Sequence, residues 1–476
     1  MKEHRTVFVS GNFNVLHPGH LRLLRFAKEC GHRLIVSIGS DRIAGAAAHV
    51  REQLRLEGLQ SNSWVDEVFI SDEPVIEVIA RLQPDIVVKG KEHELRLNAE
   101  QEVLQKYGGR LLFSSGETVF SSLDLIQKEF NKLDPRNISL PREYLERHGI
   151  KLSRLKNLLQ SFSNLRVCVV GDLIVDEYIT CQPLGMSQED PTIVVTPVDS
   201  TRFVGGAGIV AAHAAGLGAT VQFFSVTGND KTREFALEQS KAYNVNANLL
   251  IDESRPTTLK QRYRSKGQSL LRVSHLHQGA ITGALQAQLL TALEQALDGA
   301  DLLVFSDFNY GCLPQPLVDR LVAMAKSRGV LLAADSQSSS QVGDISRFKG
   351  MDLITPTERE ARISTRNRED GLVVLAEQLR RQASAQNVLL TLGEEGLLIH
   401  SAKGNSWLTD RVDVLNSAAK DVAGAGDSLL ITSAMTLVCD GTIWEAACLG
   451  SLAAAVQVGR VGNTPLRTEE LLWELT

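Results

Sequence analysis

TVFVSGNFNVLHPGH, residues 6–20, predicts a buried strand, a loop with two glycines and the start of a helix. The run Thr6–Ser10 is apolar and largely β-branched, as buried strands are, and His20–Cys30 has the pattern of a helix. The same rhythm continues, with strands expected at Arg33–Ile38, Glu67–Ser71 and Asp85–Lys89 and a helix at Val75–Leu82. Strands that alternate with helices predict βαβ units and a parallel sheet.

The loop between the first strand and helix suits phosphate binding. A helix N-terminus offers unpaired N–H groups and positive potential, and Gly11 and Gly19 let the backbone approach a ligand closely. His17 and His20 are three residues apart, so both can reach the same anion and stabilise charge that grows at phosphorus. A metal site is the alternative, but no nearby Cys, Asp or third His completes a ligand set.

The string HPGH after GNFN resembles the HxGH signature of the nucleotidyltransferase superfamily, in its cytidylyltransferase-like branch. Three later segments resemble further motifs of that family in the same order. They are Trp64–Val68 (WVDEV), Pro84–Gly90 (PDIVVKG) and Phe120–Ile126 (FSSLDLI). The resemblance implies a Rossmann-like nucleotidyltransferase domain over residues 1–132, with a last helical segment at Leu123–Lys132.

By this resemblance, His17 and His20 hold the transferring phosphates and are catalytic. The residues implied to bind the nucleotide are Gly11, Phe13, Asn14, Lys89, Ser121 and Ser122. Asn14 stands where many members have Asp, and Leu123 replaces the usual Thr. The loop over residues 40–55 leaves open whether Arg51 or Arg55 takes the family's basic position.

A second phosphate-binding pattern is DVAGAGD, residues 421–427, followed by an apolar helix at Ser428–Leu437. Backbone N–H groups of such a loop form an anion hole, and Asp427 could accept a proton from a hydroxyl during phosphoryl transfer. Small residues before a helix also serve close packing, so the pattern alone leaves that alternative open.

Companion motifs strengthen the catalytic interpretation. They are Gly171–Asp172 and Asp176 after a strand that begins at Arg166, Gly205–Gly208 (GGAG) before a small-residue helix, and Thr391–Gly396 (TLGEEG) between two strands. Together with GAGD they resemble the ribokinase family of sugar kinases, also called PfkB. The resemblance implies a ribokinase-like, doubly wound α/β domain over residues 165–476. A linker and helix precede it at 133–164, with one amphipathic helix expected at Tyr144–Phe162.

The kinase resemblance also implies residue roles. Asp427 is the catalytic base, and Gly424, Ala425 and Gly426 form the anion hole. The other implied contacts are Asp176, Gly205 and Gly206 with the sugar, Thr391 and Gly393 with ATP, and Glu360 with Mg²⁺, indirectly.

The two modules together resemble the bifunctional family that joins a heptose 7-phosphate kinase to a heptose 1-phosphate adenylyltransferase in lipopolysaccharide precursor synthesis. The resemblance implies ATP as the phosphoryl donor and also as the adenylyl donor, with Mg²⁺. It also implies that Lys260, Arg262 and Arg272 meet the sugar phosphate, with a solvated strand edge as the alternative. The familiar fused enzyme carries its kinase first, whereas here the transferase leads.

Several kinase positions depart from the family. Ile209 replaces Asn after GGA-x, Tyr310 and Gln337 replace lysines, Thr357 replaces the Asn of NxxE, and Ala423 replaces Thr before GAGD. The change to Ile209 removes a hydrogen-bond donor and acceptor from the expected sugar pocket. Either the sugar differs, which the intact GAGD favours, or the kinase half is weakened or inactive.

Three functions follow from these patterns. The leading hypothesis is a bifunctional enzyme that phosphorylates a sugar phosphate at C1 and then couples a sugar 1-phosphate to a nucleotide. The second keeps the transferase but uses CTP with a glycerol or other sugar phosphate. The third makes the kinase half a sugar-binding or dimerisation module.

Composition limits the partners and compartment. The net charge of −6 over 476 residues disfavours a nucleic-acid partner, so small-molecule sugar phosphates and nucleotides are expected. Neither a signal peptide nor a long apolar span is found, which predicts no membrane partner and a cytoplasmic location. The cysteines are scattered and fit a reducing compartment: Cys30, Cys168, Cys181, Cys312, Cys439 and Cys448. A homodimer remains open.

Overall fold

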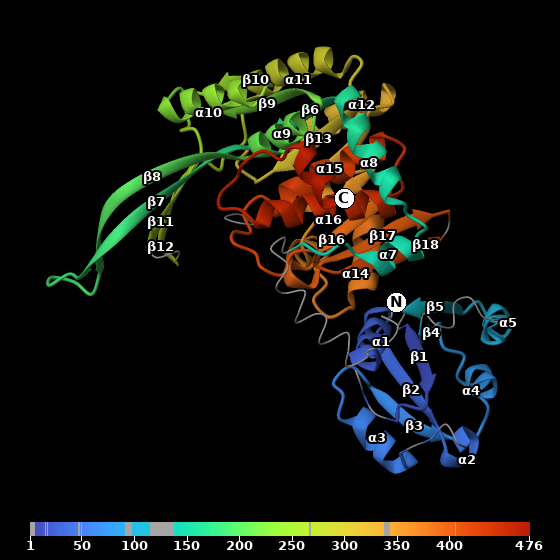
Figure 1. Ribbon diagram of the computed structural model, residues 1–476. Coiled ribbons are helices and arrows are strands. Elements are labelled where there is room, and N and C mark those ends of the chain that lie inside the picture. Colours follow the sequence, from blue (N-terminus) through green and yellow to red (C-terminus); the bar gives the residue numbers. More distant parts are fainter. Residues whose placement is uncertain are drawn as a thin grey trace. The chain divides into compact units, whose positions relative to one another are not determined.

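The computed structural model describes residues 5–14, 16, 18–45, 48, 50–90, 98–114, 138–265, 268–337, 343–404 and 406–476 (Figure 1). The chain divides into two compact units. One comprises Met1–Arg136 with Asn367–Gln378, and the other comprises Asn137–Arg366 with Leu379–Thr476.

The first unit is built on a five-stranded parallel sheet with strand order β3-β2-β1-β4-β5. Its strands are β1 (Thr6–Gly11), β2 (Arg33–Gly39), β3 (Glu67–Ser71), β4 (Ile86–Gly90) and β5 (Arg110–Ser114). Its helices are α1 (Pro18–Glu29), α2 (Asp41–Ala44), α3 (Glu52–Gln60), α4 (Val75–Leu82) and α5 (Glu100–Gln105). The strands and helices expected here from the sequence are confirmed, while Leu123–Lys132 lies outside the described residues.

The core of this unit forms between the sheet and α4. Val78 and Ile79 of α4 are fully buried against Phe8 and Val87 of the central strands. Apolar residues at helical spacing give α4 one apolar face, and burial of that face fixes the helix on the sheet.

The second unit is built on a nine-stranded sheet with order β10-β9-β6-β13-β14-β15-β16-β17-β18. The parallel strands are β6 (Arg166–Gly171), β9 (Thr220–Thr227), β10 (Val245–Ile251), β13 (Leu302–Asp307), β14 (Leu331–Ser336), β15 (Leu353–Ile354) and β16 (Asn387–Thr391). Two antiparallel strands complete it, β17 (Leu397–Lys403) and β18 (Ser406–Val412). This is the doubly wound α/β arrangement expected for the kinase half.

Helices cover both faces of this sheet. They are α7 (Arg142–Arg147), α8 (Leu152–Ser161), α9 (Ala207–Gly216), α10 (Lys231–Ala242), α11 (Gly283–Leu297), α12 (Gln315–Ser327), α13 (Glu358–Thr365), α15 (Ala425–Val438), α16 (Ile443–Val458) and α17 (Thr468–Glu474). A further helix, α14 (Leu372–Ala383), begins in the segment that belongs to the first unit and ends in the second. The helices α9, α15 and α16 are buried nearly all round and share one core with the sheet. Among the described residues, no helix is both long enough and apolar enough to span a bilayer.

A separate four-stranded sheet extends from the larger one as an arm (Figure 1). Its order is β12-β11-β7-β8, with β7 at Leu173–Met186, β8 at Ile193–Gly206, β11 at Leu259–Ser265 and β12 at Gln268–His275. The arm places residues distant in sequence on one surface.

The segment before β6 differs from the single helix expected over Tyr144–Phe162. It forms α7 and α8, which Gly149 separates with φ +61°, a left-handed conformation that suits glycine at a helix end. The His148 ring stacks on Trp444 at 4.2 Å, and Asp410 accepts from Arg147 at 2.6 Å. The segment therefore belongs to the core of the second unit.

Candidate functional site

The carboxyl ends of the parallel strands form one edge of the larger sheet. β6 lies between β9 and β13, so later strands add to the sheet on both sides of β6 and the strand order reverses there. Such a switch point is where open α/β sheets bind ligands. Asp172, Asp307 and Asp335 lie at the ends of β6, β13 and β14 and are all buried.

Asp427 lies in the first turn of α15, close to this edge. Gly424 caps the helix with φ +77°, a conformation that glycine adopts without strain. The Asp427 side chain is buried, and Gln337 Nε2 donates to its Oδ1 over 3.4 Å. The Asp427 carboxylate thus lies beside the unpaired backbone N–H groups at the start of α15.

The environment of Asp427 favours its neutral form. Burial and the nearby charge of Asp176 raise the pKa of this carboxyl to about 7, while Lys260 opposes the rise. A carboxyl that titrates near neutral pH suits a general base, because it combines proton affinity with a useful ionised fraction.

Asp172 organises the loop that follows β13. Its carboxylate accepts hydrogen bonds from the backbone N–H groups of Phe308 (2.8 Å), Tyr310 (3.2 Å) and Cys312 (3.2 Å). Burial and the neighbouring Asp307 raise the pKa of Asp172 to about 6, while these N–H donors oppose the rise. This structural role accounts for the Gly171–Asp172 motif.

Lys260 brings a cation into this region from the arm. Its Nζ lies 5.2 Å from the ring centroids of both Phe308 and Tyr310, within the range of cation–π attraction. Tyr310 occupies a position where the family resemblance implies lysine. An aromatic ring here thus holds a lysine from another element.

One face of the arm is basic. Strand pairing aligns Lys260 with Asp176, and Arg262 with both Tyr178 and Arg272, so these side chains share a face. Arg262 lies 3.7 Å from Asp176 Oδ1. The structure therefore brings together Asp176, Lys260, Arg262 and Arg272.

Tyr178 connects the arm to the GAGD loop. Its hydroxyl donates to Asp421 Oδ2 over 3.0 Å, and the same carboxylate accepts from the backbone N–H groups of Ala423 and Gly462, each at 3.1 Å. The guanidinium group of Arg264 lies 5.0 Å from the Tyr178 ring. Asp421 thus joins three segments beside the anion-hole loop.

A buried acidic cluster lies next to Asp427. Burial raises the pKa of Asp335 well above its ordinary value, and the charges of Glu360 and Asp427 raise it further. Glu360 completes the capping box of α13, accepting from the Thr357 N–H and hydroxyl at 2.8 Å. Within the described part of the chain, no three His, Cys, Asp or Glu side chains are arranged to hold a metal ion.

The predicted ATP-binding residues lie at the end of β16. Thr391 N–H donates to Pro356 O at 2.9 Å, which ties this strand end to the segment before α13. Gly393 has φ +61°, and no atom lies within 4 Å of the place where a Cβ would be. An open left-handed glycine leaves room for a ligand to approach the backbone.

The first unit has its own switch point, between β1 and β4. Gly11 ends β1 and Lys89 lies near the end of β4, so both are at the carboxyl edge of the sheet. His20 lies in the first turn of α1, which starts from the same edge. The structure thus brings together Gly11, His20 and Lys89, while His17, Ser121 and Ser122 lie outside the described residues.

Phe13 shapes the loop that leads into α1. It is buried with φ +47°, and its ring packs over Gly11 and lies 4.9 Å from the His20 ring. Asn14 Oδ1 accepts from Val50 N–H at 3.4 Å. The loop therefore fixes the start of α1 and the His20 ring.

Two basic residues follow this loop, and the sequence left open which matters. Arg55 is buried and donates to Asn12 O (2.9 Å), Val50 O (2.8 Å) and Asp41 Oδ1 (2.6 Å). Arg51 is exposed at the N-cap of α3. Arg55 therefore holds the loop, and Arg51 is the one accessible to a ligand.

Lys89 is half-buried and already paired. Its Nζ donates to Glu100 Oε1 at 2.7 Å and to Asn98 Oδ1 at 3.0 Å. A phosphate would have to compete with Glu100 for this ammonium group. The predicted contact of Lys89 with nucleotide or sugar phosphate stays a prediction.

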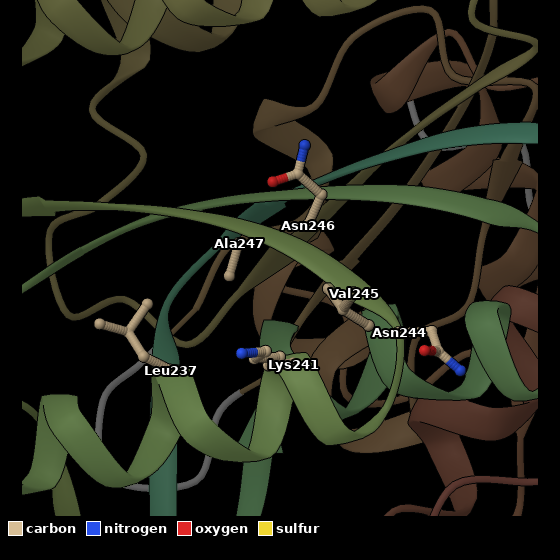
Figure 2. Close-up of a pocket in the computed structure, with 6 residues that line it drawn as sticks. All are labelled: Leu237, Lys241, Asn244, Val245, Asn246 and Ala247. Carbon is tan, nitrogen blue, oxygen red and sulfur yellow. The ribbon is translucent and has the colours of Figure 1, made fainter.

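A surface hollow of about 460 Å³ lies elsewhere in the second unit, beside α10 and β10 (Figure 2). It is lined by Leu237, Lys241, Asn244, Val245, Asn246 and Ala247. None of these residues belongs to the predicted sites, and Lys241 alone among them carries charge.

Comparison with known proteins identifies the larger unit. Residues 164–469 match the family described as pfkB family carbohydrate kinase. The chain belongs to that family. Residues 8–130 match the family described as cytidylyltransferase-like, so the transferase-like part precedes the kinase.

Curated relatives of this PfkB chain are bifunctional by name. "Bifunctional protein HldE" of Paramagnetospirillum magneticum is 30% identical over 329 residues, which cover 68% of this chain and 65% of the relative. The protein of the same name from Desulfatibacillum aliphaticivorans is 30% identical over 318 residues, covering 66% and 64%. The chain thus spans about 65% of the length of these relatives.

Solved structures resemble the PfkB fold. Arabidopsis thaliana ribokinase complexed with ribose and ATP has a TM-score of 0.52 at 17% identity, covering 65% of this chain and 98% of that one. Escherichia coli phosphofructokinase-2 with substrates and products has a TM-score of 0.53 at 16% identity, with the same coverage. At these identities the likeness shows the fold.

Sequence reasoning missed three features of the PfkB unit. Arg264 shares the basic face with Lys260 and Arg262, and the alternation of basic residues at 260, 262 and 264 was the available signal. The link from Tyr178 to Asp421 and the place of Asn463 near Gly205 had no local signal, because they join distant segments.

Proposed function

We propose that this chain is a bifunctional enzyme of nucleotide-sugar synthesis. Its kinase unit phosphorylates a heptose 7-phosphate-like sugar at C1 with ATP, and its N-terminal unit transfers AMP to a sugar 1-phosphate. The observation that carries the proposal is the buried Asp427, with its pKa near 7, beside the basic face of the arm. The relatives are called bifunctional, which supports two activities in one chain.

The kinase step follows from these groups. Asp427 accepts the proton of the C1 hydroxyl as its oxygen attacks the γ-phosphorus of ATP, and the bond to the ADP oxygen breaks. Backbone N–H groups of Gly424–Gly426 stabilise the transferring phosphoryl group. Lys260, Arg262 and Arg272 bind the phosphate that the sugar already carries.

Asp335 and Glu360 are the residues that would hold Mg²⁺ together with the ATP phosphates. Asp335 Oδ1 is buried and has no hydrogen-bond partner in the described part of the chain. Burial, together with repulsion from Glu360 and Asp427, raises its pKa, so a cation bound nearby would stabilise the ionised carboxylate. When bound, Mg²⁺ neutralises charge on the β- and γ-phosphates.

The transferase step belongs to the first unit. An oxygen of the sugar 1-phosphate attacks the α-phosphorus of the nucleoside triphosphate, and pyrophosphate leaves. His17, His20 and Lys89 stabilise the charge that develops on the phosphates, aided by the N-terminus of α1.

Purified protein tests the proposal directly. With ATP and heptose 7-phosphate we expect the 1,7-bisphosphate and ADP, and with heptose 1-phosphate and ATP we expect pyrophosphate. Faster pyrophosphate release from CTP with glycerol or other sugar phosphates would assign the first unit to the alternative substrates. No phosphoryl transfer across a panel of sugar phosphates would refute the kinase function.

The pH dependence of the kinase follows from Asp427. Because its pKa is raised to about 7, the carboxyl is protonated and inactive as a base below that pH. We expect kcat/KM for the sugar to fall about tenfold per pH unit below about 7 and to level off above it. A profile measured between about pH 5.5 and about pH 9 that is flat would contradict this role.

Assembly and compartment remain part of the proposal. The hairpin of β7 and β8 exposes five large apolar side chains, Leu184, Met186, Ile193, Val194 and Val198, which support a second copy as partner. We expect light scattering to give the mass of a dimer, and a monomer at all concentrations would refute it.

The six cysteines are free thiols, which supports the reducing cytoplasm expected from the sequence.

A further inference from the structure

Asn463 lies between the two glycine loops of the kinase unit, in the segment that joins α16 to α17. A Cβ on Gly424 of the GAGD loop would collide with Asn463 Oδ1. A Cβ on Gly205 of the GGAG loop would lie 3.4 Å from Asn463 Nδ2 and 2.5 Å from Asp176 Oδ2. The amide of Asn463 and the carboxylate of Asp176 therefore converge on Gly205.

Both polar groups have unused bonding capacity. Asn463 is 6% exposed and Asp176 is 8% exposed. Within the described part of the chain, neither Asn463 Oδ1 nor Asp176 Oδ1 has a hydrogen-bond partner. Arg262 pairs with Asp176 Oδ1 at 3.7 Å, beyond hydrogen-bond distance. Buried polar atoms are nearly always hydrogen-bonded in folded proteins, so two neighbouring oxygens without a hydrogen bond are available to a ligand.

The backbone next to Asn463 is held firmly. Gln457 Nε2 donates to Ala423 O at 3.2 Å and to Gly462 O at 3.1 Å, and Gly462 N–H donates to Asp421 Oδ2. These bonds tie the Asn463 segment to the GAGD loop. A side chain whose backbone is held by hydrogen bonds can discriminate among ligands, because its geometry is set before the ligand binds.

The GGAG loop, which is expected to contact the sugar, carries no side-chain amide. Ile209, fully buried in the first turn of α9, stands where the family has Asn. The geometry points to Asn463 as the specificity-determining residue that binds a sugar hydroxyl beside Asp176, in place of that family amide. An amide can donate to and accept from a hydroxyl, whereas a carboxylate only accepts. This inference rests on the proposed kinase function.

Kinetics and calorimetry on the full chain test the assignment with heptose 7-phosphate. Asn463→Ala is expected to raise KM and Kd for the sugar about tenfold, the effect of one lost hydrogen bond, with KM for ATP unchanged. Adding Ile209→Asn to this variant is expected to recover part of the affinity. Asn246→Ala, at an exposed position of β10, is the matched control and should change neither constant.

The outcomes separate the specificity role of Asn463 from the proposed kinase function. If the wild type binds the sugar but does not phosphorylate it, the proposed function fails, while weaker sugar binding by Asn463→Ala still supports the assignment. Unchanged KM and Kd in a folded Asn463→Ala overturn it. Should that variant fail to fold, Asn463→Asp preserves the shape and removes the donor, and unchanged sugar affinity there also overturns the assignment.

Discussion

Asp427→Asn is expected to abolish sugar phosphorylation and to leave nucleotidyl transfer intact. The amide keeps the size of the carboxyl but cannot take the C1 hydroxyl proton, so the kinase rate should fall about 10²- to 10⁴-fold. Release of ADP with heptose 7-phosphate measures the first activity, and release of pyrophosphate with the sugar 1-phosphate measures the second.

The loss of kinase activity in Asp427→Asn should not come from unfolding of the variant. Burial raises the pKa of Asp427, so its charged form is disfavoured in the folded state, and the carboxyl costs stability once pH exceeds its unfolded pKa. A neutral amide removes that cost, and the melting temperature should stay equal or rise at pH 8. Asp413→Asn, at an exposed position after β18, is the matched control and should leave both activities unchanged. Full kinase activity in Asp427→Asn would show that the base is elsewhere.

The elements of the first unit were predictable because their signals are local. The strand Glu67–Ser71 and the helix Val75–Leu82 have the bounds expected from the sequence. Each is a short apolar pattern between turn residues, and burial against the sheet agrees with that pattern. The helix break at Gly149 also had a local signal, a glycine inside an apolar repeat, which the single-helix prediction overlooked.

The arm of the kinase unit could not be predicted in the same way. Its strands β7 and β11 pair Asp176 with Lys260, residues far apart in the sequence, and no local pattern encodes that partner. Much of β8 is exposed, so burial does not produce a regular alternation there either. The motifs singled out Asp427 and Gly205 from the sequence alone, and their roles stay predictions. The position of the Asn463 amide beside Gly205 and Gly424 emerged only from the fold.

His20→Ala is expected to remove nucleotidyl transfer and spare the kinase. His20 lies in the first turn of α1, where the helix dipole already favours phosphate, and its ring packs 4.9 Å from Phe13. A donor aimed at charge that grows during transfer contributes about 10²- to 10³-fold in kcat. We therefore expect pyrophosphate release to fall by that factor, with kcat more affected than KM.

Asp427→Asn and His20→Ala are controls for each other, since each should affect only the activity of its own unit. His20→Gln retains an N–H donor and is expected to recover part of the transferase rate, which loss of packing against Phe13 alone would not explain. If His20→Ala kept normal pyrophosphate release, charge stabilisation would fall to His17 and Lys89. If it lowered both activities together, the two chemistries would not be separable by unit, and one bifunctional chain with two independent sites would be the wrong description.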